Sequence, residues 1–210
     1  MSLQLRGWTK PQRGALFVVT GASGTGKTTL VRRALQHIPG IHFSVSATTR
    51  PRRHNEKDGV DYHFLSPEQF QNLQDQDAFL EFATVYGNQY GTLKAPVEQA
   101  LASGDSILLE IDQRGAAQVR TKAPQAISIF ILPPDITTME NRLRSRKTDD
   151  DKVIERRMRE ARDQLRHCGD FDYVLINDDL ESAHDQFQSI LVSQLLRQER
   201  RSSWVSQFSQ

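Results

Sequence analysis

The sequence predicts an α/β fold in which helices flank a mostly parallel sheet. Short apolar runs rich in β-branched residues recur along the chain, as ALFVVT, SILLEID and ISIFIL illustrate. Such runs are typical of strands that are buried on both faces. Segments with a helical pattern separate them, which indicates a doubly wound series of crossover units. A length of 210 residues suits one well-buried domain and is short for two.

In the first half of the chain, each expected element has a local signal. ALFVVT is apolar and stops at glycines, FSVSATT looks extended, and VDYHFL alternates between the two faces of a strand. Ser66, with Glu68 and Gln69 close behind, predicts the start of a short helix, and Gly104 a helix end. We therefore expect strands at 15–20, 43–49 and 60–65, and helices at 27–37, after Ser66 and at 93–103.

In the second half, strands and helices alternate more regularly. The apolar residues from Ile154 to Leu165 fall on one face of a helix whose other faces carry arginines. Asp178 and Asp179 are N-cap candidates for the last helix. We expect strands at 106–112, 127–132 and 171–177, and helices at 113–123, 135–146, 150–167 and from about Leu180.

Charge and composition exclude several classes of partner. The chain has 27 Lys and Arg against 26 Asp and Glu, a formal charge of +1, so no global field favours nucleic acid or membranes. Cys168 is the single cysteine, which leaves no internal disulfide framework. The start lacks the apolar run of a signal peptide, and no apolar stretch is long enough to span a bilayer. We expect a cytoplasmic protein that acts on small molecules; its oligomeric state stays open.

A glycine loop at 21–28 carries the strongest chemical signal. It fits G-x-x-x-x-G-K-[ST] in full, after a strand and before a helix, and therefore predicts a P-loop NTPase fold. The backbone N–H groups of such a loop hold phosphate oxygens; Lys27 would reach the β- and γ-phosphates of ATP, and the Thr28 hydroxyl would bind Mg²⁺. The expected ATP site consists of Gly21, Ala22, Ser23, Gly24, Thr25, Gly26, Lys27, Thr28 and Thr29.

A GTPase is one alternative for this loop. Asp112-Gln-Arg-Gly115 mimics the D-x-x-G motif of that class at the end of a strand. However, no Asn-Lys-x-Asp motif follows, and Asn177-Asp178-Asp179 lacks the lysine. We therefore set the GTPase aside.

A second anion site is suggested by the segment 44–62. It places Ser46, Arg50, Arg53 and Tyr62 close together, and the guanidinium fork matches two phosphate oxygens. Taken alone, its arginines are more typical of a solvated basic loop than of a phosphate site.

From about Ala15 to Leu196 the chain resembles the guanylate kinase family. The resemblance rests on an ordered series of motifs: GASGTGKTTL at 21–30, SVSATTR at 44–50 followed by Arg53 and Glu56, DYHF at 61–64, FLEFATVYGNQYGT at 79–92, LLEIDQRGAAQVR at 108–120, IFILPP at 129–134 and NDDL at 177–180. It implies transfer of the γ-phosphoryl group of ATP to GMP, and also to dGMP, giving ADP and GDP for purine nucleotide metabolism.

The resemblance also implies the residues that hold GMP. Glu81 would accept the N1–H and N2 donors of guanine, a pattern that adenine lacks. Other side chains would bind the remaining base edge and the phosphate, and Glu110 stands where the family usually has aspartate. The implied GMP site is Ser46, Arg50, Arg53, Tyr62, Glu81, Tyr90, Thr92, Glu110 and Asp112. Without the resemblance, Glu81 would be interpreted as an ordinary surface glutamate.

A mobile lid over the transferred group is the last implied part. Arginines that close over the reaction supply positive charge and exclude water. The implied catalytic residues are Lys27, Arg50, Arg142, Arg146 and Arg157. The chain departs from the family at Arg52, Asn55, Ser145 and Lys147, which affects the geometry of the basic loop and the lid. Two alternatives stay open here: a noncatalytic guanylate-kinase-like module that binds phosphorylated proteins, and another small P-loop kinase.

The expected organisation is one guanylate-kinase-like domain at 15–198 between a flexible extension at 1–14 and a tail at 199–210. A parallel core would carry a small mixed β insertion that binds GMP, and a helical lid. The core would comprise 15–42, 93–134 and 168–198, the GMP-binding region 43–92 and the lid 135–167.

Overall fold

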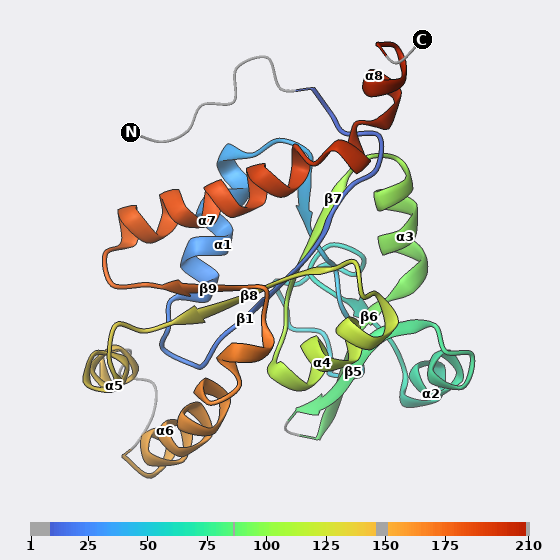
Figure 1. Ribbon diagram of the computed structural model, residues 1–210. Coiled ribbons are helices and arrows are strands. Elements are labelled where there is room, and N and C mark those ends of the chain that lie inside the picture. The colour runs from blue at the N-terminus through green and yellow to red at the C-terminus, as the bar shows by residue number, and fades with distance from the viewer. Residues whose placement is uncertain (1–8, 86, 146–150, 209–210) are drawn as a thin grey trace.

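A five-stranded parallel sheet forms the centre of the protein (Figure 1). The structure is a computed structural model that describes residues 9–85, 87–145 and 151–208. Each neighbouring pair of strands is parallel. In spatial order the strands are β2 (Ile41–Phe43), β7 (Ser106–Glu110), β1 (Leu16–Thr20), β8 (Ile127–Leu132) and β9 (Tyr173–Ile176).

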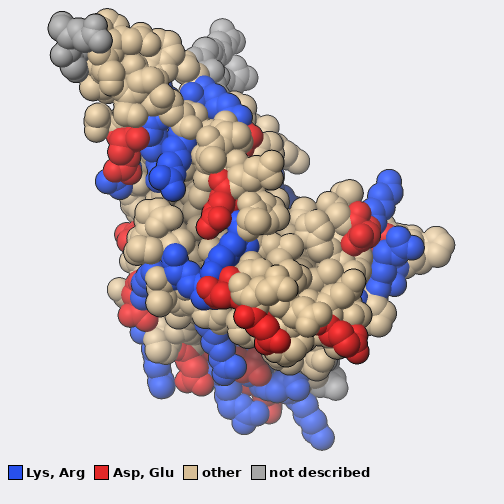
Figure 2. All heavy atoms as spheres, turned by 90° about the vertical axis from the view of Figure 1, so that its right-hand side faces the viewer, with Lys and Arg blue, Asp and Glu red and all other residues tan. Residues whose placement is uncertain are grey.

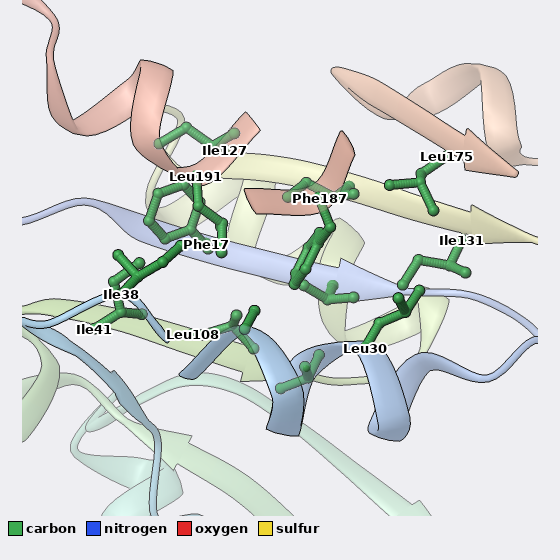
Figure 3. Packing of buried hydrophobic residues seen from close by; sticks show 14 of the residues in the cluster. Phe17, Leu30, Ile38, Ile41, Leu108, Ile127, Ile131, Leu175, Phe187 and Leu191 are labelled. Carbon is green, nitrogen blue, oxygen red and sulfur yellow. The ribbon is translucent and has the colours of Figure 1, made fainter. Parts of the chain in front are cut away.

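Helices cover both faces of this sheet because alternate side chains of its strands point to opposite faces. On β1, Phe17 and Val19 face one buried cluster together with α1 (Lys27–His37) and α7 (Leu180–Leu195). Figure 3 shows side chains of this cluster packed between the strands and both helices. The intervening residues of β1 face a second cluster, formed with α3 (Lys94–Ala102) and α4 (Gln113–Lys122).

A separate four-stranded mixed sheet lies beside α2 (Figure 1). Its order is β4 (His63–Phe64), β3 (Ala47–Thr48), β6 (Asn88–Leu93) and β5 (Phe79–Val85). The helix α2 (Pro67–Asp75) begins with a capping box between Ser66 and Gln69. It anchors on the sheet through Phe70, whose ring stacks on Phe79 with centroids 4.5 Å apart.

Two further helices, α5 (Ile136–Arg144) and α6 (Asp151–Leu165), pack on the glycine loop. Ala22 of the loop belongs to the same buried cluster as Met139 of α5 and Met158 of α6. The outer faces of α6 carry charges of both signs, with exposed Lys152, Arg156, Arg159 and Arg162 beside exposed Asp151, Glu155, Glu160 and Asp163. Figure 2 shows Lys and Arg side chains gathered along the lower edge, the level at which α6 lies in Figure 1.

The described parts of both ends of the chain contact each other. Arg200, in the short 3-10 helix η2 (Gln198–Arg200), is buried and donates to the carbonyl of Gly14 at 2.6 Å. The N–H of Gln12 donates to the carbonyl of Arg200 at 3.0 Å. The helix α8 (Ser202–Ser206) follows. The predicted limits of the extension and the tail thus fall within hydrogen-bonded segments, and this division of the chain stays a prediction.

The predicted fold class is confirmed: helices flank a parallel core, and a small mixed sheet stands apart from it. The expected strands at 43–49 and 60–65 are shorter than predicted, with β3 and β4 only two residues long. The remaining short element is the 3-10 helix η1 (Cys168–Asp170). Within the described ranges, no helix has the length and apolar character needed to cross a membrane.

Candidate active site

The glycine loop between β1 and α1 encloses a cavity of about 380 Å³. Gly24 and Gly26 have φ of 89° and 86°. These left-handed values suit glycine, whereas a residue with a side chain would be strained there. Every residue predicted for the ATP site lines this cavity except Thr25, which is buried behind the loop. The loop thus presents its backbone to the cavity, as phosphate binding requires.

Two side chains of the loop already contact oxygen atoms. Nζ of Lys27 donates to the carbonyls of Gly21 and Ala22. The Thr28 hydroxyl donates to Oε1 of Glu110, at the end of β7, over 2.7 Å. A hydroxyl and a carboxylate therefore face each other at the mouth of the loop.

A second cavity of about 430 Å³ lies between the mixed sheet and the end of β7. The predicted GMP-site residues that line it are Ser46, Tyr62, Glu81, Tyr90, Glu110 and Asp112. Thr92 lines a smaller neighbouring cavity together with Ser46 and Tyr62. The loop cavity and this second cavity share residues 110–112, so they meet at the carboxyl end of β7.

Glu81 is the buried carboxylate of this second cavity, with 5% of its surface exposed. Its Oε1 accepts from the Thr92 hydroxyl at 2.7 Å. Burial raises the pKa of Glu81, and the nearby charge of Asp112 raises it further. Asp112 caps α4, because its carboxylate accepts from the N–H of Gly115 at 2.8 Å.

Gly115 makes room for Glu81. A Cβ at this position of α4 would lie 2.7 Å from Oε2 of the glutamate, closer than real side chains approach. From the sequence, Gly115 was part of the D-x-x-G motif and of the family motif at 108–120, and neither gave it a role of its own. No local signal marks this role, because the contact joins a helix to a strand of another sheet.

The basic loop is ordered around Glu56. Its Oε1 pairs with Nη2 of Arg50 at 2.6 Å, and its Oε2 accepts from the N–H of Arg53 at 2.8 Å. The Arg50 guanidinium, followed by the Arg53 N–H, lowers the pKa of Glu56. Arg50 also lies over the ring of Tyr62, 5.4 Å from its centroid. Its guanidinium is thereby held beside the second cavity.

Of the basic-loop and tyrosine residues predicted for GMP, the structure brings together Arg50, Tyr62 and Tyr90. The rings of the two tyrosines lie 6.1 Å apart. The side chain of Arg53 is exposed, and it contributes its backbone to Glu56. Sequence reasoning gave Glu56 no role, although the opposite charge six residues after Arg50 was an available signal.

The predicted lid arginines lie in different surroundings. Nη1 and Nη2 of Arg142 donate to the carbonyls of Asn177 and Asp178 at 3.0 and 3.4 Å. Arg157 is half-buried on α6, and Gln164 of the same helix lines the loop cavity. Arg146 lies outside the described residues. The catalytic roles of these arginines stay predictions.

Comparison with known proteins identifies this arrangement. A family model described as guanylate kinase matches residues 13–194. The chain belongs to the guanylate kinase family. The guanylate kinase of Neisseria gonorrhoeae is 46% identical over 195 residues, which cover 93% of this chain and 95% of that protein. The guanylate kinase of Aromatoleum aromaticum is 48% identical over 184 residues, 88% of this chain and 90% of that one.

A solved structure agrees with this assignment. The guanylate kinase of Anaplasma phagocytophilum superimposes with a TM-score of 0.71 at 31% identity, covering 90% of each chain. Members of the guanylate kinase family are phosphotransferases that phosphorylate GMP with ATP as donor. The expected fold, enzyme class and phosphoryl donor are therefore confirmed.

Proposed function

We propose that this guanylate kinase family member binds ATP on the glycine loop and GMP in the cavity beside the mixed sheet, with dGMP as a second acceptor. The observation that carries this assignment is the shared wall of the two cavities at 110–112. Two nucleotides bound there would point their phosphates toward the same place, the end of β7. Direct transfer needs that proximity.

Glu81 is the guanine reader in this proposal. A buried carboxylate accepts hydrogen bonds from N1–H and N2 of guanine, and an adenine in the same place leaves it unpaired. Thr92, Ser46 and Asp112 complete the contacts to the base. Arg50, Arg53, Tyr62 and Tyr90 bind the monophosphate, a role supported by the pairing of Arg50 with Glu56 and its packing on Tyr62.

In the transfer step, a phosphate oxygen of GMP forms a bond to the γ-phosphorus of ATP while the bond from that phosphorus to the bridging oxygen breaks, and ADP leaves. The acceptor oxygen is already nucleophilic, so no strong general base is needed. Catalysis consists of alignment and charge neutralisation. Lys27 and Arg50 supply charge within the described site, and Arg142, Arg146 and Arg157 supply it from the lid, proposed at 135–167.

Magnesium is the implied metal ion, and the loop fits it. In the described part of the chain, no group of three or more His, Cys, Asp or Glu residues could hold a metal by itself. The Thr28 hydroxyl and the Glu110 carboxylate, 2.7 Å apart, are hard oxygen ligands of the kind Mg²⁺ takes alongside phosphates and water. Bound there, the ion would neutralise phosphate charge. We expect the enzyme to act in the cytoplasm, with small molecules as its partners.

A coupled assay with ATP and Mg²⁺ tests the proposal by comparing GMP, dGMP, AMP and UMP. We expect turnover of GMP and dGMP, and a kcat/KM for AMP lower by about 10⁴, because the acceptors of the site stay unpaired. Glu81→Gln should raise KM for GMP and leave KM for ATP unchanged. Equal use of AMP, or an unchanged KM for GMP in the variant, would show that guanine is read elsewhere.

A further inference from the structure

Asn177 joins the end of β9 to the back of the glycine loop. It has 4% of its surface exposed, and its N–H donates to the carbonyl of Leu132 at 2.8 Å. Its side-chain Nδ2 donates to the carbonyl of Thr25 at 2.7 Å. Its own carbonyl accepts from Arg142 of α5 at 3.0 Å. Asn177 is thus held on the sheet and reaches the one loop residue that is turned away from the cavity.

This hydrogen bond determines where a neighbouring N–H points. The carbonyl of Thr25 and the N–H of Gly26 belong to one planar trans peptide unit, so they point in opposite directions. Because the carbonyl is drawn toward the buried side by Asn177, the N–H of Gly26 is directed to the other side, where Gly26 lines the cavity. That N–H is one of the donors that a phosphate would meet.

The fit between Asn177 and Gly26 is close. A Cβ on Gly26 would lie 2.3 Å from Nδ2 of Asn177, so the amide occupies the space that a side chain would need. Thr25 is fully buried, and without Asn177 its carbonyl would lose this partner in a place that water does not reach. A peptide unit freed from this bond can rotate and turn its N–H away from the phosphate.

We infer that Asn177 is a positioning residue for the phosphoryl donor: it fixes the Thr25–Gly26 peptide so that the loop presents its N–H to the phosphates of ATP. The inference rests on the proposed function of the loop as the ATP site. It predicts a defect confined to the donor nucleotide, because the GMP cavity does not contact Asn177.

The experiment measures ADP and GMP affinity by calorimetry, and KM for ATP, in the full chain and its variants. Asn177→Ala should weaken ADP binding and raise KM for ATP by about 10-fold, the effect of a lost buried hydrogen bond, while GMP affinity stays within about 2-fold. Asn177→Asp keeps the size but places an acceptor against the Thr25 carbonyl, so its loss should be at least as large. GMP binding in the same samples reports that each variant is folded.

If Asn177 acted only by filling space, the two variants would differ in ADP affinity. Asn177→Asp would then bind ADP about as well as the unchanged chain, and only Asn177→Ala would be impaired. The matched control is Asp179→Ala, two residues away, which removes the N-cap of α7 and lowers the melting temperature. It should leave ADP affinity within about 2-fold, since it does not touch the loop. Full ADP affinity in Asn177→Asp, or an equal loss in Asp179→Ala, would overturn the inference. Absence of ADP binding in the unchanged chain would instead overturn the proposed ATP site.

Discussion

The proposed ATP and GMP sites are built in opposite ways, although they meet at the end of β7. The ATP site is one continuous loop on the main sheet, and most of it is backbone: glycines with left-handed φ and N–H groups around a cavity. The GMP site consists of side chains from several separate segments, most of them on the small mixed sheet and the others at the end of β7. Two of its charged groups are held by other side chains: Arg50 by the carboxylate of Glu56, and Glu81 by the hydroxyl of Thr92.

This difference determines how each site can fail and what it can recognise. Backbone N–H groups recognise phosphate but not a base, so a loop of this kind selects for charge and geometry. Side chains with defined donors and acceptors can distinguish one base from another. We therefore expect changes on the ATP side to affect binding of the donor and the transfer step, and changes on the GMP side to affect mainly the choice and binding of the acceptor.

Lys27→Met should give the largest effect. It removes the one long cationic side chain of the loop and keeps most of its volume. We expect kcat to fall by about 10³, because the negative charge on the transferred phosphoryl group loses a stabilising partner. KM for GMP should change little. Steady-state kinetics with both substrates, beside a melting curve, would measure this. Lys10→Met is the control, since Lys10 pairs with Asp105 away from both cavities; near-normal turnover in Lys27→Met would contradict the role.

Gly115→Ala should produce a smaller change, confined to the GMP side. The new methyl group meets the Glu81 carboxylate at 2.7 Å and displaces it, so we expect KM for GMP to rise about 10-fold, the equivalent of one lost hydrogen bond. The helix itself should tolerate alanine, which favours helical structure over glycine by roughly 1 kcal/mol.

Gly169→Ala is the matched control for this change. A Cβ there would meet no atom within 4 Å, and the residue lies in η1, outside both cavities. Kinetics of the two variants with GMP and ATP would compare them directly. An unchanged KM for GMP in Gly115→Ala would mean that Glu81 can shift without loss of GMP binding, and that GMP recognition does not depend on its position.

The same contrast explains which parts of the site were predictable. The glycine loop is contiguous, so its motif and the flanking strand and helix could be read directly, and β1 and α1 lie where predicted. Glu81 carries no local signal; its role was inferred only through the resemblance of 79–92 to the guanylate kinase family. The pattern of that stretch does not predict the β5–β6 hairpin, which is stabilised by pairing with β3 and packing on α2.

Contacts between distant segments account for what the sequence did not predict. Asn177 was considered as part of an incomplete base-binding motif and of the family motif NDDL, in neither case with a role of its own, whereas in the fold it reaches Thr25, 152 positions earlier. That contact exists because β9 lies beside β8, next to the glycine loop. Likewise, the extended patterns at 43–49 and 60–65 predicted longer strands than β3 and β4, because partners in the mixed sheet pair with only two residues of each.

The smallest predicted effect concerns stability, and it has the opposite sign to the effect on function. The raised pKa of Glu81 means that the folded chain holds a proton on this carboxyl more readily than the unfolded chain does. At neutral pH the buried charge therefore destabilises the free enzyme. Glu81→Gln removes the charge while an amide oxygen can still accept from Thr92, so we expect a small gain in the stability of the free chain, seen as a higher Tm.

The pH dependence of this gain identifies its cause. The destabilisation is fully present above the folded pKa of Glu81 and disappears as the pH falls below its ordinary value of 4.5, so the advantage of Glu81→Gln should disappear over the same range. Urea titrations of both chains at pH 7 and pH 4 would measure it. If the variant were less stable at both pH 7 and pH 4, the carboxylate of Glu81 would be a net stabilising group in the folded chain. A gain at pH 7 alone, with a higher KM for GMP, would show that guanine recognition is maintained at the expense of stability.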